Sequence, residues 1–459
     1  MSTQTASENS QLRFDFIPAR EVVMRPSAGQ LTSDAGLLAI RQFDERTGWT
    51  AGFAACLGDQ RDAAVHSVCS MIRQRVYGIL AGYEDCNDHD ALRDDPVFKM
   101  VAGRLPEDAP LASQPTLSRL ENAVTIAELL KMIDLTVQQG VQQVKRKHGG
   151  TLPRRVTIDL DSTDDPTHGQ QHLTFFHGFY DQHQYLPMIV SEPTTKHVFI
   201  AWLRHGTAGA ALGADDDINR VSQAFQRVDP SVRLHVRGDR GIGGPTLYEL
   251  CEKDGHTYTF GMATNPKLKG WAHALEKRAQ KAYAATGQKQ RLFAVYTYRA
   301  CRWNRSRTVV AKAECSREGA NLRFIVTNLP VKNAQQAQKT YDDYVQRGES
   351  EHRMDELKNG LSAGRLSCHR FRANFLRLLI HTLAFNMLNA LRDDGRVPEE
   401  LRVARPETLR TKLIKVAARV VQTTRRIIIE LSECWPFWPL LERVGCRALG
   451  AARLRAASP

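Results

Sequence analysis

The sequence contains no long hydrophobic run. A membrane-spanning helix needs about 18 consecutive apolar residues, whereas the most apolar stretch, at 375–385, is shorter and contains Arg377. Residues 1–10 are polar and lack the apolar core of a secretion signal, and we expect them to be disordered. These absences predict a protein that is not exported and does not cross a membrane, and therefore a cytoplasmic one.

The sequence also lacks paired cysteines. Its 9 cysteines are scattered and none belongs to a Cys-x-x-Cys pair, which argues against both a zinc ribbon and a disulfide framework. There is no internal repeat and no long low-complexity tract. At roughly 150 residues per domain, a chain of 459 residues is long enough for several domains.

Charge is the unusual part of the composition. Lys and Arg number 63 against 50 Asp and Glu, giving a net charge of +13, which favours a polyanionic partner. Residues 1–150 hold 16 basic and 19 acidic residues, whereas residues 401–459 hold 12 and 4. The basic surplus therefore lies after residue 150, where it serves either a polyanion or solubility alone.

Residues 30–150 are predicted to be helical, because apolar residues recur there at helical spacing. Within this region, segment 113–122 has a proline near its start and fits two interpretations equally well. One is the second helix of a helix-turn-helix, with Ser118 and Arg119 facing DNA. The other is an ordinary helix that begins at Ser113 as its N-cap.

The pattern changes after residue 150 to short runs of alternating apolar and polar residues, which indicate strands. The expected order is strands at 156–160, 185–190 and 197–203, a helix at 215–228, a strand at 232–236, a helix at 247–253 and a strand at 258–262. Such an order suits an α/β fold with a mixed sheet flanked by helices.

Residues 264–325 interrupt this scheme with a basic stretch and two further strand patterns, so we expect a β-rich insertion. A strand at 322–327, a long helix at 334–361 and an apolar helix at 371–391 follow. The tail, 401–459, is predicted to be a basic amphipathic helix followed by a segment rich in Trp and Pro.

Two acidic residues stand at strand ends. Asp161 ends the first predicted strand and Asp239 ends the fourth, each on the face opposite the apolar residues. Carboxylates from neighbouring strands can converge on a hard divalent cation. For each residue alone, the simpler interpretation that it begins a turn is favoured.

The predicted long helix carries a second polar set. Tyr344, Arg347, Glu351 and Lys358 fall within a stripe about 60° wide at 100° per residue. This stripe suits a carboxylate metal ligand flanked by phosphate-binding cations. An Arg347–Glu351 ion pair on a solvated face is the competing interpretation.

Together these motifs resemble a known family. Asp161-Ser-Thr163, Arg237-Gly-Asp239 and the Tyr-x2-Arg-x3-Glu-x6-Lys spacing resemble the three motifs of DDE transposases, especially those of bacterial insertion sequences with a Tyr-Arg-Glu-Lys signature. Further segments that resemble one branch of that group lie at 74–85, 111–122, 160–171, 175–178, 327–329 and 367–371. Arg240 is a departure, since a small residue is expected after Asp239.

The resemblance implies an RNase H-like catalytic domain and a division of the chain. The expected parts are a flexible N-terminus (1–29), a helical DNA-binding domain (30–150), a core in two pieces (151–263 and 326–400), the insertion (264–325) and a basic helical C-terminal region (401–459).

The resemblance also implies a chemistry. Asp161, Asp239 and Glu351 would hold two Mg²⁺ ions, which Mn²⁺ can replace, for phosphodiester hydrolysis and strand transfer. The element would be excised by cut and paste through a hairpin end. Tyr344, Arg347 and Lys358 would bind the DNA phosphate. The implied partners are double-stranded DNA, as terminal inverted repeats and target, and a second copy of the chain, in the nucleoid of a bacterium.

Two predictions carry alternatives. Trp303 is a candidate surface for a flipped base, with Trp271 second, although a packed core residue is slightly favoured. Arg240 is a candidate DNA contact. For the whole chain, the alternatives are a catalytically inactive DNA-binding regulator, against which the three intact acids argue, and an RNase H-like nuclease. Asp159, a further acid in the first strand, is given no role because Asp161 directly precedes the Ser-Thr pair.

Overall fold

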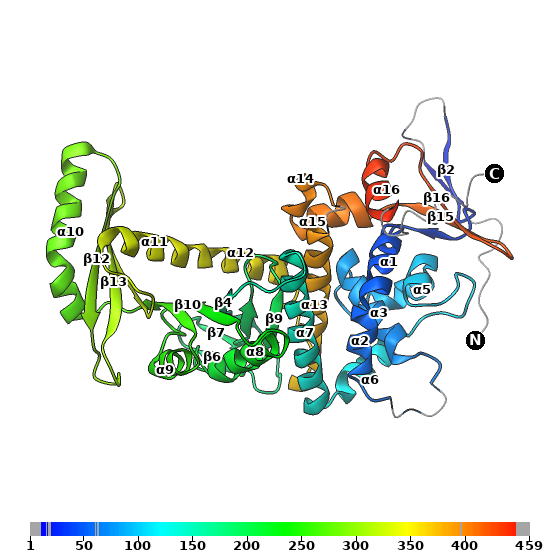
Figure 1. Cartoon of the computed structure of the whole chain (residues 1–459). Coiled ribbons are helices and arrows are strands. Elements are labelled where there is room, and N and C mark those ends of the chain that lie inside the picture. The colour runs from blue at the N-terminus through cyan, green and yellow to red at the C-terminus, as the bar shows by residue number, and fades with distance from the viewer. Residues whose placement is uncertain are drawn as a thin grey trace.

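The computed structural model describes residues 11–14, 16, 20–59, 61, 64–394 and 397–446. The molecule is elongated, with a helical N-terminal part at one end, a sheet in the middle and helix α10 at the other end (Figure 1). Residues 1–10, for which the sequence predicts disorder, lie outside the described residues. Among the described residues, no helix is both long and apolar enough to cross a membrane.

The N-terminal part is mostly helical, as predicted. Its first strands are short: β1 (Leu12–Phe14) and β2 (Val22–Met24) pair with each other in the segment expected to be flexible, and β3 (Leu31–Thr32) follows. The helices are α1 (Leu37–Thr47), α2 (Trp49–Ala55), α3 (Val68–Ala81), α4 (His89–Leu92), α5 (Pro96–Val101), α6 (Gln114–Ala123) and α7 (Ile126–Lys147).

The helix-turn-helix interpretation of segment 113–122 is wrong. The helix before α6 is α5, and residues 102–113 separate the two, whereas the motif needs a turn of about three to four residues. Ser113 does occupy the N-cap position of α6, although its side chain accepts no backbone hydrogen bond there and pairs instead with the Thr116 hydroxyl at 3.2 Å.

The central sheet has eight strands in the order β12-β13-β14-β11-β10-β4-β8-β9. β10 (Arg233–Gly238) runs parallel to both β4 (Arg155–Ser162) and β11 (Thr257–Met262), and all other neighbours are antiparallel. The remaining strands are β8 (Met188–Ser191), β9 (Val198–Trp202), β12 (Gln290–Tyr298), β13 (Arg307–Ser316) and β14 (Gly319–Thr327), and the helices α8 (Ala214–Val228) and α9 (Pro245–Lys253) connect β9 to β10 and β10 to β11.

The strand predicted at 185–190 is divided at Pro187, which lacks the N–H that a continuous strand would need. Residues before it form β7 (Gln182–Tyr185), and residues after it form β8. β7 pairs with β5 (Asp165–Pro166) and β6 (Phe175–His177) in a separate three-stranded sheet.

The β-rich interpretation of 264–325 is only half right. The basic stretch forms a 21-residue helix, α10 (Pro266–Thr286). Asn265 caps its first turn, Gly287 ends it with a positive φ, and an apolar stripe is buried along it. The strands of this region do not form a sheet of their own, because β12, β13 and β14 continue the central sheet beyond β11. They carry α10 to the end of the molecule (Figure 1).

The long helix predicted at 334–361 exists but is not regular. It consists of α11 (Ala334–Val345), a 3₁₀ turn (Gln346–Gly348), α12 (Glu349–Asp355) and a π-helical turn (Glu356–Gly360). A 3₁₀ turn winds more tightly than an α-helix and a π turn more loosely, so the uniform 100° step does not hold along it. The apolar helix α13 (Phe371–Asp393) then crosses to the N-terminal part.

The prediction of a helical tail is wrong in its central part. After α14 (Glu399–Arg402), α15 (Pro406–Leu409) and a π turn (Arg410–Ile414), the chain forms the antiparallel strands β15 (Ala418–Gln422) and β16 (Ile427–Leu431), and only then α16 (Trp438–Cys446). These strands are rich in Val and Ile, which favour extended backbone. β15 also pairs with β3, so the chain's two end regions share one sheet.

Candidate active site

Asp161 lies near the end of β4, where the sheet passes beneath α12. Its carboxylate Oδ2 accepts hydrogen bonds from Arg347 Nη1 at 2.7 Å and from Ser350 Oγ at 2.8 Å. The residue is only 8% exposed. Burial raises the pKa of this carboxyl, Arg347 and Ser350 oppose the rise, and the negative charges of Asp239 and Glu351 add to it. The three predicted acids therefore act on one another electrostatically.

Asp239 directly follows β10, the strand that pairs in parallel with β4. Its Oδ1 accepts backbone hydrogen bonds from Gly241 at 2.8 Å and Ile242 at 3.0 Å. These bonds fix the turn that leaves the strand, as the turn interpretation of this residue proposed, and Oδ2 takes no part in them. Asp239 is thus both the acid at the end of the strand and a residue of the turn that follows.

Glu351 comes from α12 and is the most exposed of the three acids. Its side chain is 71% exposed, and Oε1 lies 3.8 Å from Nη2 of Arg347. Arg347, in the 3₁₀ turn, therefore contacts two of the acids from one guanidinium. The proposed Arg347–Glu351 pair exists, but the shorter contact of Arg347 is with Asp161.

The three carboxylates have the donor chemistry that a hard divalent cation prefers. The negative charges of Asp239 and Glu351 help to raise the pKa of Asp161, and a cation would offset them, so the chemistry of this donor set fits one. Among the described residues, no group of three or more Asp, Glu, His or Cys side chains is gathered closely enough to hold a metal ion. Glu351 would have to turn from solvent toward Asp161 to complete the set.

Tyr344 and Lys358 lie on either side of this group. Burial raises the pKa of the Tyr344 hydroxyl, and the charges of Asp239 and Asp161 contribute to the rise. Gly261 on β11 permits this position, because a Cβ there would lie 2.6 Å from the Tyr344 hydroxyl oxygen. Lys358 Nζ, in the π turn, donates to Thr163 Oγ1 at 3.2 Å and to the Asp164 backbone oxygen at 2.5 Å. The structure thus brings all four residues of the predicted stripe to the ends of β4 and β10.

Asp159, which the sequence interpretation set aside, is the most deeply buried acid of this region. Both of its carboxylate oxygens pair with Arg237, and Oδ2 also accepts from Arg353 Nη2 at 2.6 Å. A sequence signal for this cluster did exist. Asp159 and Asp161 share one face of a strand, as do Arg237 and Asp239, and charged residues on a covered face need partners.

Arg240 is exposed and lines a groove of about 560 Å³ beside Asp239. The groove runs between the ends of β10, β11 and β14 and helix α11, and its basic residues are Arg240, Arg323 and Arg347. Such a lining suits an anionic ligand. The exposed position of Arg240 leaves its predicted DNA contact sterically available.

Trp303 does not offer the surface predicted for a flipped base. It is only 7% exposed, packs edge-on against Tyr248 and Tyr298, and lies under the guanidinium of Arg307. The slightly favoured alternative, a packed core residue, is therefore correct. Trp271 is 41% exposed and carries Lys267 over its ring, but it lies on α10 in the insertion.

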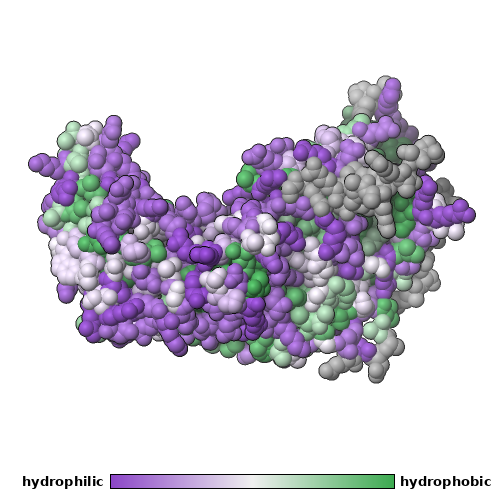
Figure 2. Space-filling view, viewed as in Figure 1, coloured by the Kyte–Doolittle hydropathy of each residue, from purple (hydrophilic) through white to green (hydrophobic). Residues whose placement is uncertain are grey.

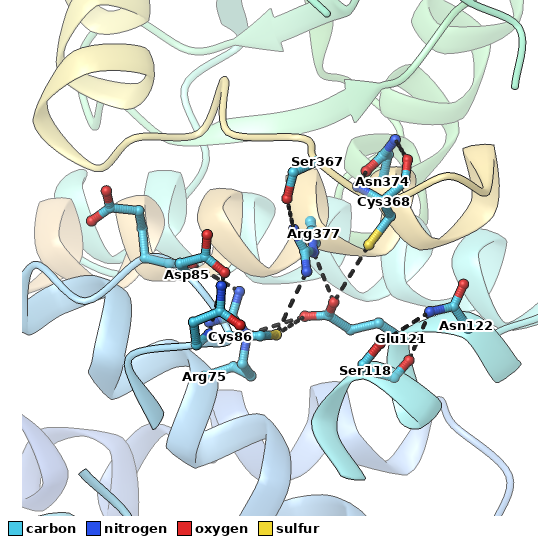
Figure 3. Close-up of polar contacts among 12 residues, drawn as sticks. Arg75, Asp85, Cys86, Ser118, Glu121, Asn122, Ser367, Cys368, Asn374 and Arg377 are labelled. Atoms are coloured by element: carbon cyan, nitrogen blue, oxygen red, sulfur yellow. Dashed lines mark hydrogen bonds and ion pairs between the residues drawn. The ribbon is translucent and has the colours of Figure 1, made fainter. Parts of the chain in front are cut away.

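In α6, Arg119 is exposed and Ser118 is half-buried, and the opposite face of the helix is fixed by Glu121. The Glu121 carboxylate pairs with Arg75 at 3.1 Å and with Arg377 at 2.7 Å (Figure 3). Cys86 and Cys368 direct their thiols at the same carboxylate. Three segments that carry part of the family resemblance thus meet around one buried acid, Glu121. They are 74–85, 111–122 and 367–371.

Comparison with known families assigns the chain. The family described as "Transposase DDE domain group 1" matches residues 14–449, nearly the whole sequence. The protein belongs to the DDE transposases. As a member of this family the transposase is a DNA-cleaving enzyme, and members typically use divalent metal ions.

No curated protein matches the transposase. Among solved structures, it is similar to a piggyBac transposase in a synaptic complex with hairpin DNA. The two share 14% sequence identity with a TM-score of 0.40, over 83% of this chain and 80% of the other. At that level the likeness adds nothing to the assignment of the transposase, which depends on the family match.

Proposed function

We propose that this transposase excises an insertion sequence by cut and paste, cutting at the element's ends through a hairpin and then joining it to target DNA. The observation that supports the proposal is the placement of three acids around Arg347: Asp161 on β4 bonds to its guanidinium, Glu351 on α12 lies 3.8 Å from it, and Asp239 directly follows β10, the strand parallel to β4. Three carboxylates from three elements suit phosphodiester chemistry with divalent metal ions.

The topology supports an RNase H-like core. β4, β8 and β9 form an antiparallel series, and β10 and β11 follow through helices as strands parallel to β4. The first two acids then stand at the carboxyl ends of adjacent parallel strands. This core would be the catalytic one, with β12, β13, β14 and α10 extending its sheet.

In this proposal Asp161, Asp239 and Glu351 hold the metal ions, Mg²⁺ or Mn²⁺. When bound, the ions activate the attacking oxygen and stabilise the leaving one. Arg347 and Lys358 bind the phosphate on either side of the scissile bond, and Tyr344 positions it from the wall of the groove. Arg347 would exchange its contact with Asp161 for the phosphate, because both are oxyanions that accept from the same guanidinium.

The shape of the molecule supports double-stranded DNA as the substrate. Figure 2 shows a hollow in the face that α11 and α12 cross, between the end carrying α10 and the helices α14 and α15, and hydrophilic residues dominate it. The helical segment from α11 to α12, which contains Tyr344, Arg347 and Glu351, borders this hollow. Pairing two element ends also calls for two copies of the chain, and we propose a homodimer for that step.

Excision tests the proposal. A donor plasmid carrying the element's own ends should lose the element when the protein and Mg²⁺ are supplied. Asp161→Asn, Asp239→Asn and Glu351→Gln should each abolish excision and leave binding of the ends intact. Glu349→Gln, at an exposed position of the same helix, is the matched control and should excise normally.

The outcomes separate the alternatives. End binding without excision by the unaltered protein would support an inactive regulator. Cleavage of RNA–DNA hybrids in preference to the element's ends would support a nuclease. Normal excision by the three acid variants would show that the acids are wrongly assigned.

A further inference from the structure

A buried ionic cluster joins the elements that carry the three acids. Asp159 on β4 is 0% exposed. Its Oδ1 accepts from Arg237 Nε at 2.7 Å, and its Oδ2 accepts from Arg237 Nη2 at 3.1 Å and from Arg353 Nη2 at 2.6 Å. Arg237 and Arg353 are themselves 2% and 5% exposed. All three groups are thus shielded from solvent, and both guanidinium groups bind the one carboxylate.

The cluster is in register with the acids. Each member of the cluster lies two positions from one of the acids in the sequence. Asp159 precedes Asp161 in β4, and Arg353 follows Glu351 in α12. Arg237 lies in β10, the strand that ends just before Asp239. The contacts Asp159–Arg237 and Asp159–Arg353 therefore tie β4 to β10 and β4 to α12 within one turn or one strand step of the acids.

We propose that Asp159, Arg237 and Arg353 are positioning residues that set the separation of the three carboxylates. This inference rests on the proposed function, since it concerns the same site. Arg237 extends the cluster to α11, because its Nη1 donates to the backbone oxygen of Asp343 at 2.6 Å. The cluster therefore also fixes the helix that presents Tyr344 and Arg347 to the groove.

An ionic cluster suits this task better than apolar packing would. Apolar residues of similar volume can fill such a site at equal or lower cost in free energy, but they tolerate small sliding of helix against sheet. The bidentate bonds between Arg237 and Asp159 fix both distance and angle.

Two variants test the proposal. Asp159→Glu keeps every charge but lengthens the side chain by one methylene. Arg353→Lys keeps the charge but loses the guanidinium whose Nη2 donates to Asp159 Oδ2. Arg307→Lys is the matched control, because Arg307 on β13 is as buried as Arg353, 4% against 5% exposed, and pairs with the Glu252 carboxylate of α9 at 2.8 and 2.9 Å. Four quantities are compared for each variant. They are the melting temperature, the KM and the turnover on the element's ends, and the Mn²⁺ affinity measured by electron paramagnetic resonance.

We expect both cluster variants to lower turnover and Mn²⁺ affinity by roughly 10- to 100-fold, as loss of a residue supporting a metal ligand does. KM for the DNA ends and the melting temperature should match those of Arg307→Lys. If Asp159→Glu and Arg353→Lys equal the control in turnover and Mn²⁺ affinity, the cluster only stabilises the fold and the proposal is wrong.

Folding failure would not leave the question open. Mn²⁺ affinity is measured on the folded fraction isolated by gel filtration, and Asp159→Glu retains all charges if Arg353→Lys does not fold. Loss of folding in both variants but not in the control would overturn the positioning role in favour of a structural one. Failure of the proposed function is a separate result, namely normal cleavage by Asp161→Asn, Asp239→Asn and Glu351→Gln.

Discussion

Arg347 donates a 2.7 Å hydrogen bond to the carboxylate of Asp161, although 186 positions separate the two in the sequence. The bond joins the helical segment α11–α12 to the end of β4, the first strand of the central sheet in chain order. It also places a guanidinium against the most buried of the three predicted metal-binding acids. The protonation of Asp161 therefore depends on Arg347.

Replacing Arg347 should change the pH dependence of DNA cleavage. Burial already raises the pKa of Asp161, and Arg347 opposes the rise, so Arg347→Gln should raise that pKa further. A higher pKa means that Asp161 ionises only at higher pH, and the acidic limb of the cleavage profile should move upward. Single-turnover cleavage measured across pH would show this, with activity at neutral pH reduced roughly 100-fold by loss of phosphate stabilisation. Arg347→Lys should shift the limb less. An unmoved limb in Arg347→Gln would contradict the contact.

The two tryptophans of the insertion should lose different amounts of stability on truncation. Trp303 is buried among aromatic rings, so Trp303→Ala should lower the free energy of unfolding by about 3–5 kcal/mol. Trp271→Ala, at a partly exposed position, should cost far less. Denaturant unfolding of both variants makes the comparison. Equal stability of the two would mean that Trp303 is not part of the core.

Asp165 should make the protein less stable as pH rises. Its carboxyl is 3% exposed, neither oxygen has a hydrogen-bond partner among the described residues, and burial raises its pKa to about 8. A raised pKa means that the folded state holds a proton that the unfolded state releases, so the free energy of unfolding should fall by about 1.4 kcal/mol per pH unit. The fall begins near the ordinary value of 3.8 and ends near 8.

The Asp165→Asn variant isolates this contribution, because an amide does not titrate. Its unfolding free energy should decline less steeply than that of the unaltered protein between those pH values. Asp181→Asn, at an exposed position, should keep the original slope. Identical slopes for all three proteins would mean that Asp165 is ionised in the folded state.

Glu121 should be essential to the junction between the helical N-terminal part and α13. Glu121→Gln would leave Arg75 and Arg377 buried without their shared counter-charge (Figure 3), which should cost about 3–5 kcal/mol of unfolding free energy. The control is Glu84→Gln, which breaks a contact with the exposed Arg365 and should cost under about 1 kcal/mol. Chemical denaturation would compare the two, and a similar cost for both would refute the buried pairing.

The sequence predicted the central strands well because their signal is local. The alternation of Val156, Ile158 and Leu160 indicates β4 whatever surrounds it. The strands β15 and β16 were missed because part of their stability comes from pairing with β3, almost 400 positions earlier. Helix α10 was missed although its caps, Asn265 and Gly287, are local signals. Its apolar stripe is weak, because two of the four buried residues are alanines and the remaining surface is rich in Lys and Arg.

The candidate site, too, could be predicted only where its signal is local in the sequence. The spacing of the stripe was enough to suggest that Tyr344, Arg347, Glu351 and Lys358 belong together, although a 3₁₀ turn and a π turn replace the regular helix that the spacing assumed. The role of Asp159 depends on Arg353, which no local pattern connects to it. Burial of Trp303 depends on rings from α9 and β12. Such contacts follow from the tertiary fold and not from spacing.

The sheet that β3 shares with β15 and β16 has a consequence for the order in which the protein can be completed. A ribosome makes the N-terminal part first, but the partner strand of β3 emerges only after residue 418 has been translated. The helices α3, α6 and α7, which pack against α13, also stay incompletely covered until residues 371–393 have been synthesised. A product that stops before residue 418 would carry Asp161, Asp239 and Glu351 but an N-terminal part in which β3 lacks its partner strand.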